Sequence, residues 1–516
     1  MGPTDGDGRR RDDETSTGLY DPLVAHHARV LDPGKATRRR SSTKNGGVEL
    51  AVEPTIYIVD QVLVASTPVD DDSGLRGFRE FAGSRGFDTD IDAANQEVFR
   101  RDGGTDRPSS WVTPVRLTPA AGTAAPIDAW TLVQEYRAAT EVEDPGDDPP
   151  SWVKDPVPVG LDHLMYANVL GQTMTVGGTM TVGGTMTVGG TMTVGGTMTV
   201  GGGVRNQYAV PGLGGRTPVA HVGPAPTRSA ERKGPQVAVL DTGIGSHPWL
   251  TDGVTRVAAI PDDGSEGPGV VHNRLEGVLD DFSGHGTFIA GLLRQTCPDA
   301  DLVAVKVMGA DGCVSESTMI TALENLAIDH RVDRPLAAVS MSFGYYHEAA
   351  DDDKTASLLG ALQNLASLQV VMVASAGNDA TSRPMFPAAF TTTIDELISV
   401  GARNPNGTVA LFSNSGTWVD TYFSGAQVFS TLPAGREAAT VFDGALQPTA
   451  RTTVGELVRE SLDPDDFSAG FATWSGTSFA APAFLGRCLQ SYLDGAEQSP
   501  SALVKLLRDV ADEYRR

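Results

Sequence analysis

Three short segments of this chain carry an acid, a base and a nucleophile, each beside glycine or another small residue. Asp241 lies in V-L-D-T-G, His285 in S-G-H-G-T and Ser478 in S-G-T-S-F-A-A-P. Small neighbours leave room for the backbone of a second molecule to approach a reactive side chain. A serine hydroxyl becomes a nucleophile when a neutral imidazole takes its proton, and a carboxylate fixes the tautomer of that imidazole. We therefore predict that Ser478 is the nucleophile, His285 the general base and then general acid, and Asp241 the residue that orients the histidine.

The three segments and their Asp–His–Ser order resemble those of the subtilisin-like serine peptidases, the subtilases. The resemblance covers about residues 236–495 and implies a serine endopeptidase that hydrolyses peptide bonds through an acyl-enzyme. It also implies that Asn378, in A-S-A-G-N-D, donates a hydrogen bond to the oxyanion. The substrate-binding residues implied by the resemblance are Ser342, Phe343, Gly344, Ala376 and Gly377.

From residue 235 onward, continuous apolar runs alternate with helical patterns, which predicts an α/β domain with a parallel sheet covered by helices on both faces. The expected strands are 236–240, 301–307, 336–342, 370–374 and 397–401, and the expected helices begin at His285, Ser317, Ala356 and Ser478. Functional residues in such sheets lie at the carboxyl ends of strands and at helix N-termini. The three motifs fall at those positions.

A smaller unit over residues 51–170 is expected to order its elements β-α-β-β-α-β, the split ferredoxin-like arrangement. Its expected strands are 56–64, 98–99, 112–117 and 161–166, and its helices contain Leu75, Phe78 and Phe81, and Ile127, Trp130, Val133 and Tyr136. Subtilases often carry a propeptide of this topology whose tail lies across the active site. The resemblance therefore implies an intramolecular inhibitory domain, with a separate recognition domain as the alternative.

The remaining segments are expected to be a disordered tail over residues 1–50 and a linker over 171–234, followed by the catalytic domain over 235–516. The linker contains T-M-T-V-G-G five times in succession, from Thr173 to Gly202. Hexapeptide repeats can build a β-helix, but this repeat has little apolar bulk to bury, so we favour a flexible tether. Proteolysis concentrates on exposed tethers, so this segment is an expected cleavage site between the two domains.

The charge composition of the chain restricts the classes of molecule that it is expected to bind. The formal net charge of −25 and the sequence pI near 4.7 argue against nucleic acid and anionic membranes, leaving protein or peptide substrates. No apolar run approaches the length of a membrane span and no secretory signal is recognised, so we expect a cytoplasmic protein.

The three cysteines are expected to be buried apolar residues, with a Cys297–Cys313 bridge left open. We expect no catalytic metal or organic cofactor; structural calcium is left open without named ligands.

Three other interpretations compete with a subtilase-like peptidase. D-T-G at Asp241 is also the signature of aspartic proteases, but these need two such carboxylates, and Asp72-Ser73-Gly74 lacks the strand to present the second. An α/β-hydrolase would place its histidine after the serine, and no histidine follows His347. The third interpretation is a binding protein on a peptidase fold that is catalytically silent or activated by a partner.

Two features depart from the family pattern. Trp249 stands where a small or acidic residue is common and could reshape the rim of the site. Residues 432–473 look like an insertion before the nucleophile, which we interpret as a solvated surface loop rather than a partner-binding element.

Overall fold

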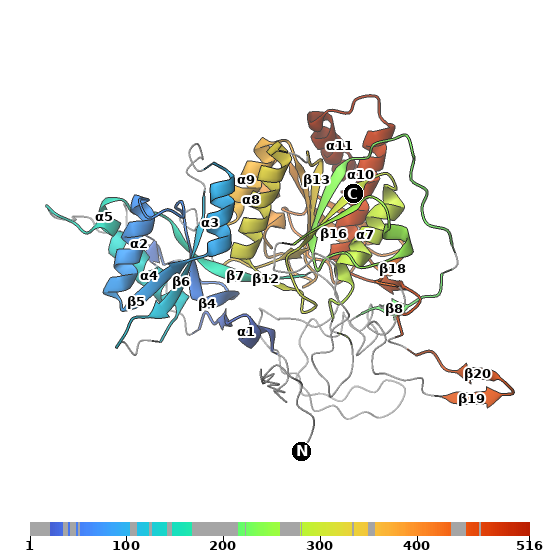
Figure 1. Cartoon of the computed structure of the whole chain (residues 1–516), viewed down its shortest axis with the longest axis horizontal. Helices are drawn as coiled ribbons and strands as arrows, with labels where there is room; N and C mark the ends of the chain where they lie inside the picture. Colours follow the sequence, from blue (N-terminus) through green and yellow to red (C-terminus); the bar gives the residue numbers. More distant parts are fainter. Residues whose placement is uncertain are drawn as a thin grey trace, which may run out of the picture.

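The structure of the chain is a computed structural model in which two domains lie side by side (Figure 1). It describes residues 21–34, 40–41, 48–49, 52–103, 111–122, 126–141, 147–167, 215–221, 223–258, 279, 281–332, 335–348, 357–434, 450–463 and 466–515. The TMTVGG tract and much of the tail expected over residues 1–50 lie outside these residues. Among the described residues, no helix has both the length and the apolar character needed to cross a bilayer.

The larger domain is built on a seven-stranded parallel sheet with the order β10-β11-β9-β13-β15-β16-β17. The strands are β9 (Gln236–Asp241), β10 (Val254–Ala258), β11 (Asp301–Lys306), β13 (Ala338–Met341), β15 (Val371–Ser375), β16 (Leu397–Arg403) and β17 (Thr421–Ser424). Its helices are α7 (His285–Thr296), α8 (Glu316–Val332), α9 (Leu359–Ser367), α10 (Thr477–Asp494) and α11 (Pro500–Tyr514). Figure 1 shows α8 and α9 on one face of the sheet and α7, α10 and α11 on the other. The predicted α/β fold with a parallel sheet is confirmed.

The smaller domain contains a four-stranded antiparallel sheet with the order β7-β4-β6-β5. Its elements in chain order are β4 (Thr55–Val64), α2 (Ser73–Ser84), β5 (Phe87–Ile91), α3 (Ala93–Arg101), β6 (Thr113–Pro119), α4 (Ala129–Thr140), α5 (Ser151–Lys154) and β7 (Val159–Ala167). Without the short helices α3 and α5, this is a β-α-β-β-α-β order. The apolar stripes of α2 and α4 meet where Phe78 and Phe81 pack edge-on against Tyr136.

The strand expected at Val98 and Phe99 is wrong, because both residues lie in helix α3. Asp92 caps this helix by accepting a hydrogen bond from the backbone N–H of Asn95. The second strand is instead β5, which begins at Phe87. Two adjacent apolar residues do not distinguish a helix from a strand, so only the cap could have indicated the correct element.

The expectation of a disordered tail is wrong for residues 21–34, which form α1 (Pro22–Ala25) and β1 (Ala28–Leu31). The short strands β2 (Arg40–Ser41) and β3 (Val48–Glu49) also pair. Strand β1 pairs antiparallel with residues 55–58 of β4, whereas β6 pairs only with residues 61–64. The first half of β4 would otherwise present an open edge, and β1 fills it.

The last part of the expected linker, residues 215–234, is packed against the catalytic domain. Arg216 is fully buried, and β8 (Thr217–Pro218) pairs with β21 (Phe471–Trp474). Further along, Arg228 forms an ion pair with Asp301 at 2.6 Å. The boundary expected at residue 235 is therefore too late, because a segment rich in Gly and Pro can still pack when buried polar side chains anchor it.

The two domains are joined by continuous strand pairing. Strand β7 pairs antiparallel with β12 (Cys313–Ser315) and with β14 (Phe343–Gly344), both from the catalytic domain. The two lie on opposite sides of β7, because Tyr166 pairs with Cys313 of β12 and with Gly344 of β14. The antiparallel sheet of the smaller domain thus extends into the larger one. This junction brings the end of β7 to the segment that follows β13.

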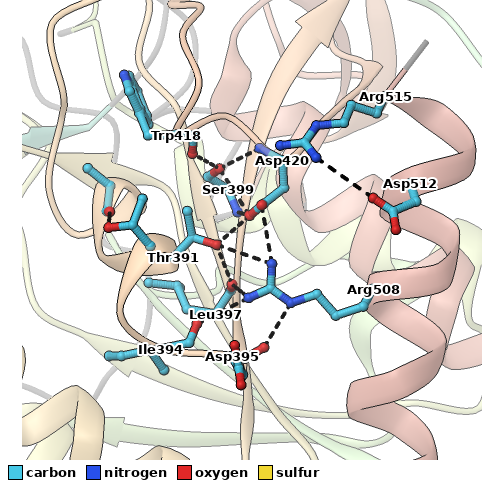
Figure 2. A network of polar contacts seen from close by, with 12 residues as sticks. Thr391, Ile394, Asp395, Leu397, Ser399, Trp418, Asp420, Arg508, Asp512 and Arg515 are labelled. Carbon is cyan, nitrogen blue, oxygen red and sulfur yellow. Dashed lines mark hydrogen bonds and ion pairs between the residues drawn. The ribbon is translucent and has the colours of Figure 1, made fainter.

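Helix α11 closes the far side of the parallel sheet through one arginine (Figure 2). Arg508 donates to the carbonyl oxygens of Leu397 at 2.8 Å and Ile394 at 3.1 Å, and pairs with Asp420 at 3.2 Å. Asp420 in turn accepts from the backbone N–H of Ser399 at 2.9 Å. The C-terminal helix is therefore tied to β16 and to the start of β17.

Peripheral elements complete the catalytic domain: β18 (Val428–Thr431), β19 (Arg451–Val454), β20 (Leu457–Glu460), η1 (Pro248–Leu250) and η2 (Ala388–Thr392). The described part of the expected insertion includes the β19–β20 hairpin, every residue of which is exposed. Trp249 is buried, with its ring 5.0 Å from that of Phe471, so it belongs to an aromatic cluster beneath β18 and β21.

Candidate active site

Asp241 and His285 form a buried pair at the carboxyl end of strand β9. Asp241 is the last residue of β9 and His285 the first of α7, and neither side chain is exposed. Nδ1 of His285 donates to Oδ1 of Asp241 at 2.7 Å, and the same oxygen accepts from the N–H of Thr242 at 2.8 Å. Nε2 of His285 is buried without a hydrogen-bond partner among the described residues. This nitrogen is therefore available to take a proton.

The start of α7 lies tightly against the turn that follows β9. A Cβ at Gly286 would be 2.1 Å from the carbonyl oxygen of Gly243, so only glycine fits there. The N–H of Gly286 donates to Oγ1 of Thr242 at 2.9 Å. The small residues beside Asp241 and His285 thus allow the two backbones to approach and hold the pair in register.

Aromatic rings surround the imidazole, and sequence reasoning did not identify them. The ring of His285 lies 5.7 Å from that of Trp474, edge to face, and 5.4 Å from that of Phe479. Because both neighbouring rings are fully buried, they exclude water from this side of the imidazole. Phe479 directly follows the predicted nucleophile, Ser478, which was the signal available in the sequence.

Arg216 organises the segment that leads into His285. Its guanidinium donates to the carbonyl oxygens of Ser283 at 2.7 Å, Asp281 at 2.9 Å and Leu279 at 3.3 Å, and it lies 4.9 Å from the ring of Trp474. No feature of the sequence indicates this role, because Arg216 lies in a segment that is expected to be linker.

Ser478 is the second residue of α10 and is fully buried. Its Oγ donates to the carbonyl oxygen of Ser342 at 3.0 Å, and Oγ of Ser342 donates back to the carbonyl of Ser478 at 2.9 Å. The predicted roles require Asp241, His285 and Ser478 to be linked by hydrogen bonds, and in this structure only Asp241 and His285 are. In this arrangement the Ser478 hydroxyl donates its hydrogen bond to the Ser342 carbonyl and not to Nε2 of His285.

Asn378 lies just beyond the end of β15, with its amide oriented by a residue that was not predicted. Its Oδ1 accepts from the N–H of Thr477 at 2.9 Å and from the Thr477 hydroxyl at 3.0 Å. Its Nδ2 is buried without a hydrogen-bond partner among the described residues. Because the oxygen of the amide is already used, the remaining donor is fixed in direction. The available signal was a hydroxyl residue directly before Ser478.

The predicted substrate-binding edge is occupied by another part of the chain. Phe343 of β14 pairs with Ala167 of β7, and Gly344 pairs with Tyr166, in an antiparallel register. Ala376 and Gly377 do not share this pairing: Ala376 donates to the carbonyl of Val400 and Gly377 to the hydroxyl of Thr477. At Gly377, φ is +102° and a Cβ would lie 2.3 Å from Nδ2 of Asn414, so this position requires glycine.

No metal is assigned at this site. Two groups elsewhere in the described part of the chain place three nitrogen, oxygen or sulfur donors within 4.8 Å of one another: His26, Asp311 and Cys313, and His163, His347 and Glu348. His26 donates directly to Asp311 at 2.7 Å, and both ring nitrogens of His163 already face carboxylates, so hydrogen bonds account for both groups. Cys297, Cys313 and Cys488 are buried and free, and the bridge left open for Cys297 and Cys313 is not formed.

Comparison with known proteins gives related sequences across the larger domain. The model of the subtilase family matches residues 232–488. An "Intracellular serine protease" of Paenibacillus polymyxa is 29% identical over 262 residues, which are 47% of this chain and 73% of that protein. "Subtilisin BL" of Lederbergia lenta is 30% identical over 233 residues, which are 43% of this chain and 74% of that protein. The "Major intracellular serine protease" of Bacillus subtilis is 28% identical over 221 residues, 40% of this chain and 62% of that protein.

Proposed function

Because the chain belongs to the subtilase family and is a serine endopeptidase, we propose that Asp241, His285 and Ser478 are its catalytic triad and that the N-terminal domain regulates it. The observation that carries the triad is the buried Asp241–His285 hydrogen bond, which leaves one ring nitrogen open to accept a proton. The unpartnered Nδ2 of Asn378 supports the proposal, since it is a buried donor with no other task.

Catalysis begins when a turn about the Cα–Cβ bond of Ser478 moves Oγ from the Ser342 carbonyl toward Nε2 of His285. The imidazole takes the hydroxyl proton while Oγ attacks the substrate carbonyl, and Asp241 stabilises the imidazolium that forms. The oxyanion accepts a hydrogen bond from Nδ2 of Asn378. His285 then protonates the leaving amine, the peptide C–N bond breaks, and water hydrolyses the acyl-enzyme by the same proton route.

Autoregulation is supported by the position of β7. It pairs with the edge on which an extended substrate would lie, and its last described residue, Ala167, is opposite Phe343. Backbone pairing of this kind tolerates many side chains, so a substrate strand would compete with β7 for the same hydrogen bonds. His285 and Ser478 are fully buried in this state, so substrate must displace part of the chain before it can bind.

The substrates are proteins or peptides, as the family implies. Two relatives are named intracellular serine proteases, and we extend an intracellular location to this chain on that basis. We further propose that catalysis needs no metal or organic cofactor, since nucleophile, base and oxyanion donor are all side chains of the protein.

A fluorophosphonate probe tests the nucleophile, because it reacts only with a serine whose proton can be removed. We expect the chain to be labelled at Ser478 and the Ser478→Ala variant not to be labelled. Absence of labelling after the N-terminal domain has been cleaved off would favour the alternative of a silent or partner-activated binding protein.

Intact-mass spectrometry of the same samples tests autoregulation. We expect a first self-cleavage between Ala167 and Gly215, absent in Ser478→Ala, followed by faster labelling. If the chain is instead cut after Arg216 and the enzyme stays active, Arg216 is not needed to position the segment that leads into His285. Labelling of the intact chain as fast as that of the cleaved enzyme would contradict inhibition by β7.

A further inference from the structure

A second histidine, His163, is buried at the junction of the two domains. It lies in β7, and its Nδ1 is 2.6 Å from Oε2 of Glu316 while its Nε2 is 2.8 Å from Oε2 of Glu348. The imidazole and the Glu316 carboxylate have no exposed surface, and that of Glu348 is 2% exposed. Both glutamates belong to the catalytic domain, Glu316 at the start of α8 and Glu348 beyond β14. The side chain from one domain is thus enclosed by two carboxylates from the other.

This geometry determines the protonation of the ring. An ionised carboxylate only accepts hydrogen bonds, so each carboxylate that faces a ring nitrogen requires a proton on that nitrogen. With both nitrogens protonated, His163 is an imidazolium cation. Two buried carboxylates without such a cation would carry a large desolvation cost, which the imidazolium offsets.

The other groups around His163 fit a site for one cation. Glu316 also accepts from the Tyr345 hydroxyl at 3.1 Å and from the N–H of Leu358 at 2.9 Å, and the Tyr345 ring stacks on the imidazole at 4.5 Å. The further titratable or charged groups near the cluster are His347, Asp162, Arg137 and Arg383. Burial by itself lowers the pKa of His163, but the hydrogen bonds to Glu316 and Glu348 outweigh it and raise the pKa to about 10.

We propose that Glu316 and Glu348 form a recognition site on the catalytic domain for one imidazolium side chain carried by a docking β-strand. Its occupant here is His163, and release of the N-terminal domain is therefore coupled to loss of a proton. His163 lies three residues before Tyr166 on the strand that covers the substrate edge, so the site extends that edge beyond β14 onto the start of α8. The inhibitory consequence depends on the proposed function; the recognition itself does not.

The sign of the coupling follows from the two states of the histidine. A free histidine titrates near pH 6.5, whereas docked His163 holds its proton to about pH 10. The stabilisation of the docked state is complete below pH 6.5 and is lost as the pH rises toward 10. One coupled proton changes the docking equilibrium by up to about tenfold per pH unit in this window. Burial of Asp162 raises its pKa to about 6, so its own titration lies below the window.

Hydrogen–deuterium exchange of the full-length Ser478→Ala variant tests docking without relying on activity. Exchange is measured for peptides covering β7, β12 and β14 from pH 6 to 9.5 and corrected for the intrinsic rate, with β9 and β15 as internal references. We expect protection at the junction to fall steadily above pH 7 while the references stay protected. In His163→Gln the protection should be at least about tenfold lower at pH 6.5 and should no longer depend on pH, because a charge-assisted pair is lost on each side of the ring.

A matched control is His26→Gln. His26 also bridges the domains, through Asp311 at 2.7 Å, but its side chain is 30% exposed. This variant should keep the pH dependence of the parent. Equal loss of the pH dependence in both histidine variants, or pH-independent protection in the parent, would overturn the proposal.

A metal at this site is a separate outcome of the test. Stoichiometric zinc in the purified protein, with junction protection lost on addition of EDTA, would overturn the imidazolium, since a nitrogen bound to a metal carries no proton. The ¹⁵N shifts of the His163 ring provide an independent reading of its charge state. Because all of these measurements use Ser478→Ala, they stand even if the proposed peptidase mechanism fails, and failure of labelling at Ser478 leaves them unaffected.

Discussion

In the described part of the chain two buried imidazoles are hydrogen-bonded to carboxylates, and they differ in how many carboxylates each one contacts. His285 meets one, Asp241, at Nδ1, while its Nε2 has no hydrogen-bond partner among the described residues. His163 meets two, Glu316 and Glu348, one at each ring nitrogen. A single carboxylate orients the ring and leaves a basic nitrogen open, whereas two carboxylates fix the ring as a cation. The same pair of residue types thus suits proton transfer in one place and domain docking in the other.

The two sites also differ in what brings their parts together. Asp241 and His285 belong to one domain and are fixed by the close approach of Gly286 to Gly243. The His163 cluster is assembled only when β7 pairs with β12 and β14. A site within one domain can be permanent, whereas a site divided between two domains exists only in the docked state.

The largest expected effect separates the two histidines directly. His285→Ala should lower kcat by several orders of magnitude with little change in KM, because the group that accepts the serine proton is lost. His163→Gln should instead leave the chemistry of the released enzyme intact and raise the labelling rate of the uncleaved chain. Turnover of a peptide substrate and fluorophosphonate labelling measure the two effects. Similar loss of turnover in both variants would contradict separate roles for His285 in catalysis and His163 in docking.

The next largest effect concerns the oxyanion donor. Asn378→Leu keeps the volume but removes Nδ2, and loss of the equivalent donor in subtilisin lowers kcat by about 10²–10³. We expect a loss of that order here, with substrate KM nearly unchanged. Steady-state kinetics of the cleaved enzyme test this, and Thr477→Val, which removes one of the two bonds that orient the amide, should give a smaller loss in the same direction. An unchanged kcat in Asn378→Leu would exclude this side chain from oxyanion binding.

Arg216 tests how far the active site depends on the segment after the tether. Arg216→Met removes the bonds to the carbonyls of Ser283 and Asp281, so the start of α7 should shift and kcat should fall by up to about a hundredfold. Arg216→Lys should recover little, because an ammonium lacks the planar fork that reaches several carbonyls. If the thermal midpoint falls while kcat per labelled site does not, Arg216 has a purely structural role.

The smallest effect is the pH profile of the cleaved enzyme. The rate should rise with pH by no more than about tenfold per unit and then level off, because only the neutral imidazole accepts a proton. The uncleaved chain should continue to gain labelling above that plateau, since docked His163 loses its proton only toward pH 10. Parallel profiles for the cleaved enzyme, the uncleaved chain and His163→Gln would show that docking is not proton-linked.

Many helices and strands of the catalytic domain could be predicted from local sequence patterns. The strands at 236–241 and 371–375 and the helices that begin at His285 and Glu316 appear within a residue or two of their expected positions. Their apolar runs are long and fully buried, so local pattern and tertiary environment agree. Agreement was poorer for Val98 and Phe99, which form a cluster with Trp111 of their own domain and with Ile328 of the catalytic domain, contacts that local pattern does not reveal.

The sequence by itself indicated which residues could act as acid, base and nucleophile, because small neighbours mark such positions in the chain, and its resemblance to the subtilases implied Asn378 as the oxyanion donor. Only the tertiary structure decided which histidine is paired once and which twice, that β7 pairs with the predicted substrate edge, and that Arg216 binds the segment that leads into His285. These depend on contacts between residues far apart in sequence. The hydrogen-bond partner of a buried polar group depends on which distant segments the fold brings into contact, and a local sequence pattern contains no information about that contact.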